Sequence, residues 1–411
     1  MMTSKKKVSA TGFRLTPSLK KWWRLSVLLL SFALVSCHDD NSDSPAQKEI
    51  TKTVIMYLPW SGNDIYPYLL KNIRDMESAI NGSPGTMADK RLFVFVSESD
   101  VQSYLFEVKL NQGKCFRDTL KEYRLPRLNT SAGIASILTD IKAKSATAHY
   151  AMLIGSHGMG WLPVGTYVSS RTARMKAVSA QEGWQQTRFF GHSADEDFQT
   201  DIGTLAEAIG KASLHMDYIL FDDCYMSNIE TAYDLRNVTD YLIASTSEVM
   251  IQGIPYSKVG IHLLNGDLGN VCNGFLNFYS NYTTPCGTLA ATDCRQLEQM
   301  AATMKEINSR FVFDTTELSG LQILDGFSRP MFYDFGDYVD HLCKNADLLS
   351  LFRQQLNALV VYKVNTPTFY SALNHRQTDI KTFSGLTISD PSTNTSVTSA
   401  RTQTAWYQAT H

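Results

Sequence analysis

The hydrophobic residues of this chain fall into short continuous runs, separated by stretches with helical spacing. Continuous or alternating apolar runs predict strands over residues 52–60, 92–96, 103–110, 150–154, 218–221 and 241–246. Apolar positions three and four residues apart predict helices over residues 66–80, 131–144 and 201–213. Because the strands alternate with helices, we expect an α/β fold with a mainly parallel sheet covered by helices on both faces.

The pattern changes at two places along the chain. Between residues 161 and 200 it has no period, and a stretch of that length without structure is usually functional or cleavable. Beyond about residue 300, helices over 331–343 and 348–361 are followed by strand-like, turn-rich sequence. We therefore predict one α/β domain over residues 51–300. A C-terminal α+β extension over 301–411 is either a second subdomain or part of the first.

The N-terminus has the features of an export signal. Lys20, Lys21 and Arg24 precede an apolar stretch over residues 25–35, and Cys37 follows, an order typical of a secretory signal peptide. The apolar stretch is shorter than the roughly 20 residues that span a bilayer. The Leu-x-Ser-Cys junction resembles a bacterial lipobox and implies lipidation of Cys37; an ordinary signal peptide with an incidental cysteine is the alternative. We expect a lipoprotein signal peptide over 1–36 and a flexible tether over 37–50.

The acidic residues directly behind Cys37 resemble the surface-export signals of Bacteroidetes lipoproteins. This resemblance implies a lipid-anchored protein of a bacterial cell envelope, at the outer membrane or the cell surface. No other segment is long and apolar enough to cross a membrane. The expected membrane attachment is therefore the N-terminal lipid alone.

Charge and cysteine content narrow the classes of partner and cofactor. Seven of the 38 basic residues lie in the first 36, which leaves 31 basic against 40 acidic residues and a net charge of −9. An acidic chain argues against nucleic acid, because phosphate binding needs a basic face. The seven cysteines show no C-x-x-C and no Cys/His spacing typical of zinc. Cys272, Cys286 and Cys294 are close enough for one disulfide, or are small buried hydrophobes.

Two of the apolar runs end in a reactive side chain. The run over residues 150–154 leads to His157, and the run over 218–221 leads to Cys224. Parallel strands present their carboxyl ends at one edge of a sheet, so an imidazole and a thiol meet there without being close in sequence. Ser227 and Glu230 have capping-box spacing, so a helix should begin just past Cys224 and favour its thiolate. We interpret the pair as the nucleophile and base of a cysteine peptidase.

Three groups of residues resemble the clostripain family of cysteine peptidases, which belongs to the clan of caspases, legumains and gingipains. The first is Ser156-His157-Gly158-x-Gly160-Trp161, and the second is Phe221-Asp222-x-Cys224-x-Met226-Ser227-Asn228. Later segments, around residues 332–338, 360–363 and 404–407, are similar as well. The resemblance covers residue 52 to the C-terminus. It implies a caspase-like peptidase domain over 51–300, with 301–411 as a C-terminal subdomain of the same unit.

The resemblance also implies residue roles. His157 would be the general acid–base and Cys224 the nucleophile, with the backbone N–H groups of Gly158 and Cys224 binding the oxyanion. Asp222 would meet the cation of an Arg or Lys side chain at the substrate position before the cleaved bond, P1; a structural role for Asp222 is the alternative. Glu248 would be a second acidic residue that lines the site of the basic P1 side chain. Maturation by self-cleavage in the 161–200 loop is expected at one of three basic residues: Arg171, Arg174 or Lys176.

The sequence departs from the clostripain pattern at two places, after the histidine and on both sides of the cysteine. Met159 stands where a small residue is usual, and Asp223 and Tyr225 flank the cysteine in place of Ala and Leu. They leave the hydrolytic chemistry in place and bear on fine substrate preference.

We expect an endopeptidase that acts as a monomer on proteins or peptides with a basic P1 residue. The alternatives are a catalytically silent surface binding lipoprotein and a caspase-clan enzyme with acidic or Asn preference. No cofactor is required, and the sequence has no Asp-x-Asp-x-Asp-Gly loop that would predict calcium.

Overall fold

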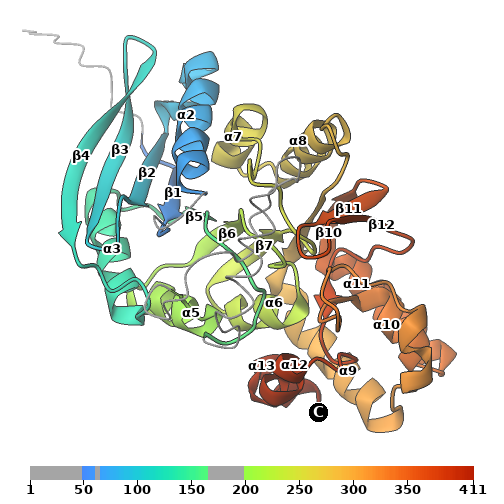
Figure 1. The fold of residues 1–411 in the computed structure, drawn as a ribbon. Helices are drawn as coiled ribbons and strands as arrows, with labels where there is room; N and C mark the ends of the chain where they lie inside the picture. Colours follow the sequence, from blue (N-terminus) through green and yellow to red (C-terminus); the bar gives the residue numbers. More distant parts are fainter. Residues whose placement is uncertain (1–48, 61–64, 165–198) are drawn as a thin grey trace, which may run out of the picture. The chain divides into compact units, whose positions relative to one another are not determined.

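The computed structural model describes residues 49–60, 65–164 and 199–411 of the chain (Figure 1). The predicted signal peptide, the lipidation residue Cys37 and the processing candidates Arg171, Arg174 and Lys176 lie outside these described residues. All further statements concern the described part.

A nine-stranded sheet forms the centre of the fold, in the order β10-β8-β7-β6-β5-β1-β2-β3-β4. The five central strands, from β7 to β2, are parallel, and the outer strands on both sides are antiparallel. The strands are β1 (Lys52–Leu58), β2 (Lys90–Ser97), β3 (Gln102–Asn111), β4 (Lys114–Arg124), β5 (Tyr150–Ile154), β6 (Met216–Phe221), β7 (Thr239–Ala244), β8 (Thr288–Asp293) and β10 (Val360–Asn365). Two small antiparallel pairs, β11 (Thr368–Ser371) with β12 (Arg376–Asp379) and β9 (Tyr333–Asp334) with β13 (Thr387–Ile388), lie outside this sheet.

Helices cover both faces of the sheet (Figure 1). On one face lie α2 (Tyr66–Gly82), α7 (Tyr256–Asn265) and α8 (Leu268–Ser280), and the short α12 (Thr395–Ala400) lies beside α13. On the other face lie α3 (Ser131–Lys144), α5 (Ile202–Lys211), α6 (Ile229–Leu235), α9 (Leu297–Arg310), α10 (Phe335–Leu342), α11 (Ala346–Leu359) and α13 (Ala405–Thr410). Successive strand residues point to opposite faces, so β1 sends Val54 and Met56 into the first core and Ile55 into the second. We call these the α2 face and the α3 face.

Most of the elements expected from the sequence are present. The strands over 52–60, 92–96, 103–110, 150–154 and 241–246, and the helices over 66–80, 131–144 and 201–213, match elements to within a few residues. Strand β4 was not predicted, because it lies at the sheet edge and most of its residues are exposed or half-buried, which removes the hydrophobic signal. The helix predicted over 331–343 begins four residues later, at Phe335, after the short strand β9. Strand β10, from the C-terminal segment, pairs with β8 and extends the main sheet.

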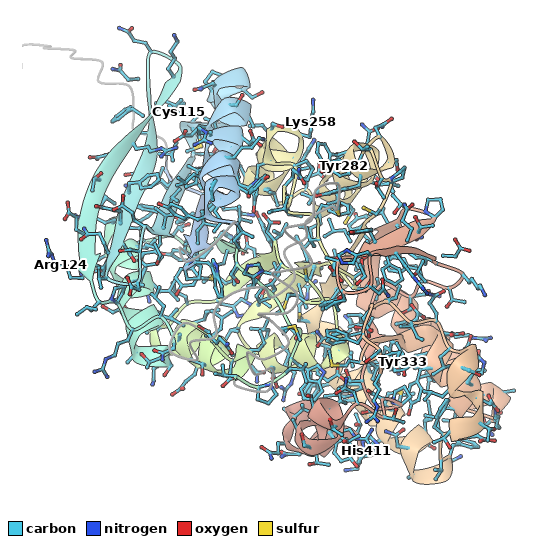
Figure 2. The ribbon with its side chains drawn as sticks, in the orientation of Figure 1. Cys115, Arg124, Lys258, Tyr282, Tyr333 and His411 are labelled. Atoms are coloured by element: carbon cyan, nitrogen blue, oxygen red, sulfur yellow. The ribbon has the colours of Figure 1, made fainter. Side chains whose placement is uncertain are left out.

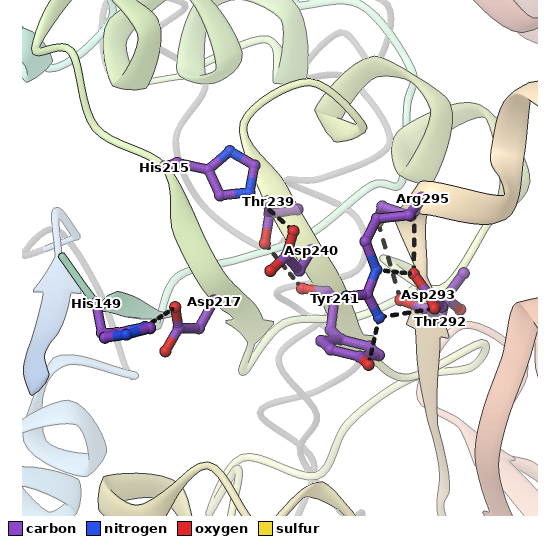
Figure 3. A network of polar contacts seen from close by, with 10 residues as sticks. His149, His215, Asp217, Thr239, Asp240, Tyr241, Thr292, Asp293 and Arg295 are labelled. Carbon is purple, nitrogen blue, oxygen red and sulfur yellow. Dashed lines mark hydrogen bonds and ion pairs between the residues drawn. The ribbon is translucent and has the colours of Figure 1, made fainter.

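Pairs of polar side chains occupy the amino-terminal edge of the parallel strands (Figure 3). His149 Nδ1 lies 3.0 Å from Asp217 Oδ1, and one strand further along His215 Nε2 lies 3.0 Å from Asp240 Oδ1. Arg295 binds Asp293 with its guanidinium at 2.8 and 2.9 Å. His149, His215 and Arg295 are exposed, whereas their acidic partners are partly or, for Asp293, largely buried. All of them lie at the end of the strands opposite to His157 and Cys224.

The cysteines of the described part are all free thiols. Cys272, Cys286 and Cys294 are buried, and burial raises the pKa of each to about 12. Cys115 on β4 faces α2 (Figure 2), where its backbone N–H donates to Asn81 and burial raises the pKa of its thiol to about 11. These thiols are therefore protonated at neutral pH and poor nucleophiles. Among the described helices, none is long and apolar enough to cross a membrane.

Candidate active site

The turns that carry His157 and Cys224 leave the same edge of the sheet from neighbouring strands. β5 and β6 are parallel, with Ile154 opposite Phe221 in the register. The N–H of Asp222 donates to the Ile154 carbonyl at 2.7 Å, which continues the pairing one step beyond β6. His157 is half-buried, and Cys224 is fully buried. The predicted meeting of an imidazole turn and a thiol turn at the carboxyl edge of the sheet is present.

Gly158 brings the two turns into direct contact. A Cβ atom at this position would lie 2.8 Å from Asp223 Cβ, 3.0 Å from the backbone nitrogen of Cys224, and closer still to the Cys224 carbonyl oxygen. Glycine is thus required here by the close approach of two backbones. Gly160 has a φ of +63°, and a Cβ there would meet the Phe332 ring at 2.8 Å. The two glycines of the His motif allow its turn to pack on the Cys turn.

Asp223 joins the same two turns through its side chain. Its Oδ1 accepts a hydrogen bond from the Ser156 backbone N–H at 2.5 Å, and its Oδ2 accepts one from the Ser156 hydroxyl at 3.2 Å. Asp223 is 2% exposed, and charge-assisted bonds in such surroundings are among the stronger ones in proteins. Asp223, the residue before Cys224, therefore links the turn of Cys224 to the turn that carries His157.

The thiol of Cys224 meets the backbone of the loop after β7. The Val249 N–H donates to Sγ at 3.2 Å, and Sγ lies 3.8 Å from the Val249 carbonyl oxygen. The capping box expected from Ser227 and Glu230 is wrong by one residue: the N-cap of α6 is Asn228, whose side chain accepts from the Thr231 N–H at 2.7 Å. A loop N–H thus donates to the thiol, and α6 begins five residues after Cys224, at Ile229.

Tyr225, directly after Cys224, has a left-handed backbone with a φ of +63°. A bulky residue in that region costs energy that its surroundings must offset. Its ring stacks on Phe332 with centroids 5.0 Å apart, and its hydroxyl donates to Glu248 at 2.8 Å. The Asn228 amide donates to the Tyr225 carbonyl at 2.7 Å. These contacts hold the chain in a sharp turn at Cys224 and Tyr225.

Asp222 and Glu248 are two buried acidic residues near Cys224. Asp222 is 1% exposed, and its Oδ1 accepts from the Ile254 N–H at 2.8 Å. Glu248 accepts hydrogen bonds from Tyr225, from the Ser371 hydroxyl and from the Ala372 N–H, so it also ties the small β11–β12 sheet to the Cys turn. Both acidic residues named from the sequence thus lie in the loops around Cys224.

The structure brings together His157, Gly158, Asp222 and Cys224 as expected, and it adds residues that the sequence reasoning missed. Asp223, Tyr225 and Asn228 position the two turns, and Trp60 packs edge-on against the His157 ring with centroids 4.9 Å apart. The Asp222-Asp223 doublet beside a cysteine was the one available signal for Asp223. In residues 49–60, 65–164 and 199–411, no group of three or more His, Cys, Asp or Glu could hold a metal ion.

Comparisons with known proteins point to one family. The model of the clostripain family, Peptidase_C11, matches residues 60–382. The crystal structure of a secreted C11 cysteine protease of Bacteroides thetaiotaomicron, "iotapain", is 46% identical over 88% of this chain and 99% of its own, with a TM-score of 0.80. No curated protein matches the chain.

Two further crystal structures add to this similarity. A clostripain of B. thetaiotaomicron in complex with the peptide inhibitor BTN-VLTK-AOMK is 52% identical over 54% of this chain and 99% of its own, with a TM-score of 0.52. An inactive zymogen C11 protease of Parabacteroides distasonis is 22% identical over 89% of this chain and 99% of its own, with a TM-score of 0.72. At that identity the last comparison supports the fold alone.

Proposed function

The chain belongs to the clostripain family of cysteine peptidases, and from this membership we propose that it cleaves peptide bonds after Lys or Arg, with Cys224 as nucleophile and His157 as general acid–base. The observation that carries the proposal is the contact between the two turns, where Gly158 packs on the Cys224 backbone. Nucleophile and base act together only when their elements hold them within reach of one substrate bond.

The reaction follows from the groups at this edge. The Cys224 thiolate attacks the carbonyl carbon of the peptide bond, and the N–H groups of Gly158 and Cys224 receive the developing oxyanion, at roughly 2.7–4 kcal/mol per donor in related chemistry. The bond to nitrogen breaks as the His157 imidazolium protonates the leaving amine. Water, deprotonated by His157, then hydrolyses the thioester and releases the free thiol and the new carboxyl terminus.

Asp222 supports the preference for a basic P1 side chain. Its carboxylate lies two residues before the nucleophile and is 1% exposed, where an ammonium or guanidinium is favoured over a neutral or anionic group. The net charge of −9 outside the first 36 residues attracts cationic peptides generally. The inhibitor bound to the 52% identical relative carries the peptide VLTK, which ends in Lys.

The processing and anchoring expectations belong to the same proposal. We propose that the peptidase matures by its own cleavage at Arg171, Arg174 or Lys176, and that Cys37 carries the lipid that attaches it to the cell envelope. We also propose that residues 301–411 are a C-terminal subdomain of the peptidase unit. Strand β10, which extends the main sheet beside β8, supports their inclusion in that unit.

Turnover of paired fluorogenic peptides tests the proposal. Peptides identical except for Arg, Lys, Asp or Asn at P1 are incubated with the wild-type protein, with Cys224→Ala and His157→Ala, and with Cys272→Ala as a matched control at a buried thiol of pKa about 12. We expect turnover of the Arg or Lys peptides, its loss in both active-site variants and its retention in the control. Turnover that survives Cys224→Ala, or that is restricted to Asp or Asn, would contradict the proposal.

A further inference from the structure

A cavity of about 120 Å³ lies beside His157, on the α3 face of the sheet. Protein interiors contain few voids larger than a water molecule, so a space of this size in a packed face needs an explanation. An engineered cavity of about 150 Å³ with apolar walls binds benzene. The space beside His157 is thus of the size of one aliphatic or aromatic side chain.

The lining of the cavity combines apolar core side chains with polar residues, among them Ser156, Thr200 and Asp201. Core side chains of the α3 face form its walls, and the turn of His157 and Gly158 lines it together with Asp223. The wall residues that matter here are Ile134, Ile154, Leu205, Phe221 and Met226. The turn of His157 therefore adjoins a space that could hold the side chain of the leaving group.

Two buried polar atoms of the lining have no hydrogen-bond partner in the part of the chain that the structure describes. Tyr57 and Trp60 line the cavity and are 3% and 7% exposed. Within the described residues, Tyr57 Oη and Trp60 Nε1 are buried and have no hydrogen-bond partner. Buried polar atoms of native proteins are normally satisfied. Both atoms can donate a hydrogen bond, so the group that satisfies them is an acceptor, such as a backbone carbonyl of a bound peptide, and not an apolar side chain.

The alternation of strand residues separates this cavity from the basic-residue pocket. β6 sends Leu220 to the α2 face and Phe221 to the α3 face. The alternation continues past the strand end: Asp222 bonds to Ile254, beside α7, and Asp223 lines the cavity. The two adjacent aspartates thus mark opposite sides of the nucleophile turn.

A bound substrate in extended conformation alternates in the same way. When its P1 side chain points toward Asp222 on the α2 face, the next side chain, P1′, points to the α3 face. P1′ belongs to the leaving amine, which must lie on the side of His157 to receive its proton. We propose that the cavity is the S1′ subsite and that it selects a large apolar side chain, such as Leu, Met or Phe, directly after the cleaved bond. This inference rests on the proposed function of Cys224 and His157.

Quenched peptides that differ only at P1′ test the assignment. With Lys fixed at P1, we expect the purified protein to cleave peptides with Leu or Phe at P1′ roughly 10- to 100-fold faster in kcat/KM than the Gly peptide, because an apolar pocket discriminates by about this factor. Asp at P1′ should be cleaved least, since the Asp223 carboxylate lines the cavity. Equal rates for Leu, Phe and Gly would overturn the assignment while leaving the proposed peptidase intact. Cleavage of no peptide in the series would overturn both.

A pair of variants on one helix locates the effect. Ile134 and Ile141 both lie in α3 and are 0% exposed, but only Ile134 lines the cavity. Ile134→Ala should enlarge the pocket and raise the ratio of Trp to Leu at P1′ several-fold, whereas Ile141→Ala should keep the wild-type ratio. The milder pair Ile134→Val and Ile141→Val serves if an alanine variant does not fold. Equal shifts in both members of a pair would contradict the assignment.

Discussion

Replacing Glu230 with Gln tests how a buried carboxyl group, six residues after Cys224, sets the pH dependence of the free energy of unfolding. Glu230 lies in the first turn of α6 and is 2% exposed. Its Oε1 accepts from the Ser389 N–H at 2.8 Å, and its Oε2 is buried with no hydrogen-bond partner in the described part of the chain. Burial, and then the nearby Asp390 carboxyl, raise the pKa of Glu230 from 4.5 to about 8.

The direction of the effect follows from proton binding. Between pH 4.5 and about 8 the folded chain keeps a proton on Glu230 that the unfolded chain releases. The stabilising contribution is therefore fully present below pH 4.5 and is lost as the pH rises to about 8, with a slope of at most about 1.4 kcal/mol per pH unit. The upper limit over this interval is about 5 kcal/mol, and we expect about 2–3 kcal/mol because water and protein dipoles relax around the ionised group.

Glu230→Gln keeps an acceptor for Ser389 and cannot ionise. We expect the variant and the wild type to have similar free energies of unfolding at pH 5, and the variant to be the more stable by about 2–3 kcal/mol at pH 8. Urea unfolding followed by tryptophan fluorescence from pH 5 to 9 measures the difference. Glu306→Gln, at a half-exposed glutamate paired with Arg310, is the control and should leave the pH dependence of the free energy of unfolding unchanged. Parallel curves for the wild type and Glu230→Gln would refute the reasoning.

Three further predictions concern the two turns. Gly158→Ala places a methyl group against the carbonyl oxygen of Cys224, so kcat/KM should fall at least about 100-fold. The control Gly210→Ala adds a methyl group in open space on α5 and should leave kcat/KM unchanged. Asp223→Ala removes the hydrogen bonds to Ser156, so kcat should fall by about 10- to 100-fold while KM changes less. The kcat of Asp223→Asn should lie between those of Asp223→Ala and the wild type. A kcat of Asp223→Ala equal to that of the wild type would count against a positioning role. Asn228→Ala should cost about 1–3 kcal/mol of stability and also lower kcat, because Asn228 both caps α6 and binds the nucleophile turn. Asn345→Ala, which removes only the cap of α11, should lower stability alone, and a matching loss of kcat there would contradict the distinction.

The sequence predicted the parts of the site that local patterns encode. Continuous apolar runs before His157 and Cys224 mark buried parallel strands, and such strands end at one edge of a sheet. The contact of the two turns was therefore foreseeable without a structure. The family resemblance supplied the role expected of Asp222.

The residues that position the turns were not foreseeable, because their partners are distant in the chain. Asp223 binds Ser156, 67 positions earlier, and Glu248 binds Ser371, 123 positions later. The N-cap of α6 is Asn228, since Glu230 is turned toward Ser389 instead of its own helix end. A capping box is a local rule, and here a tertiary hydrogen bond overrides it.

Covalent labelling tests the central claim most directly. The purified protein is treated with a peptide acyloxymethyl ketone ending in Lys, and the modified residue is located by peptide mass spectrometry. We expect a single adduct on Cys224, at a rate that His157→Ala lowers strongly and that Cys115→Ala, at the half-exposed thiol on β4, leaves unchanged. Lys-directed peptide cleavage with the adduct on another cysteine, or with no adduct on Cys224, would contradict the assignment of Cys224 as the nucleophile.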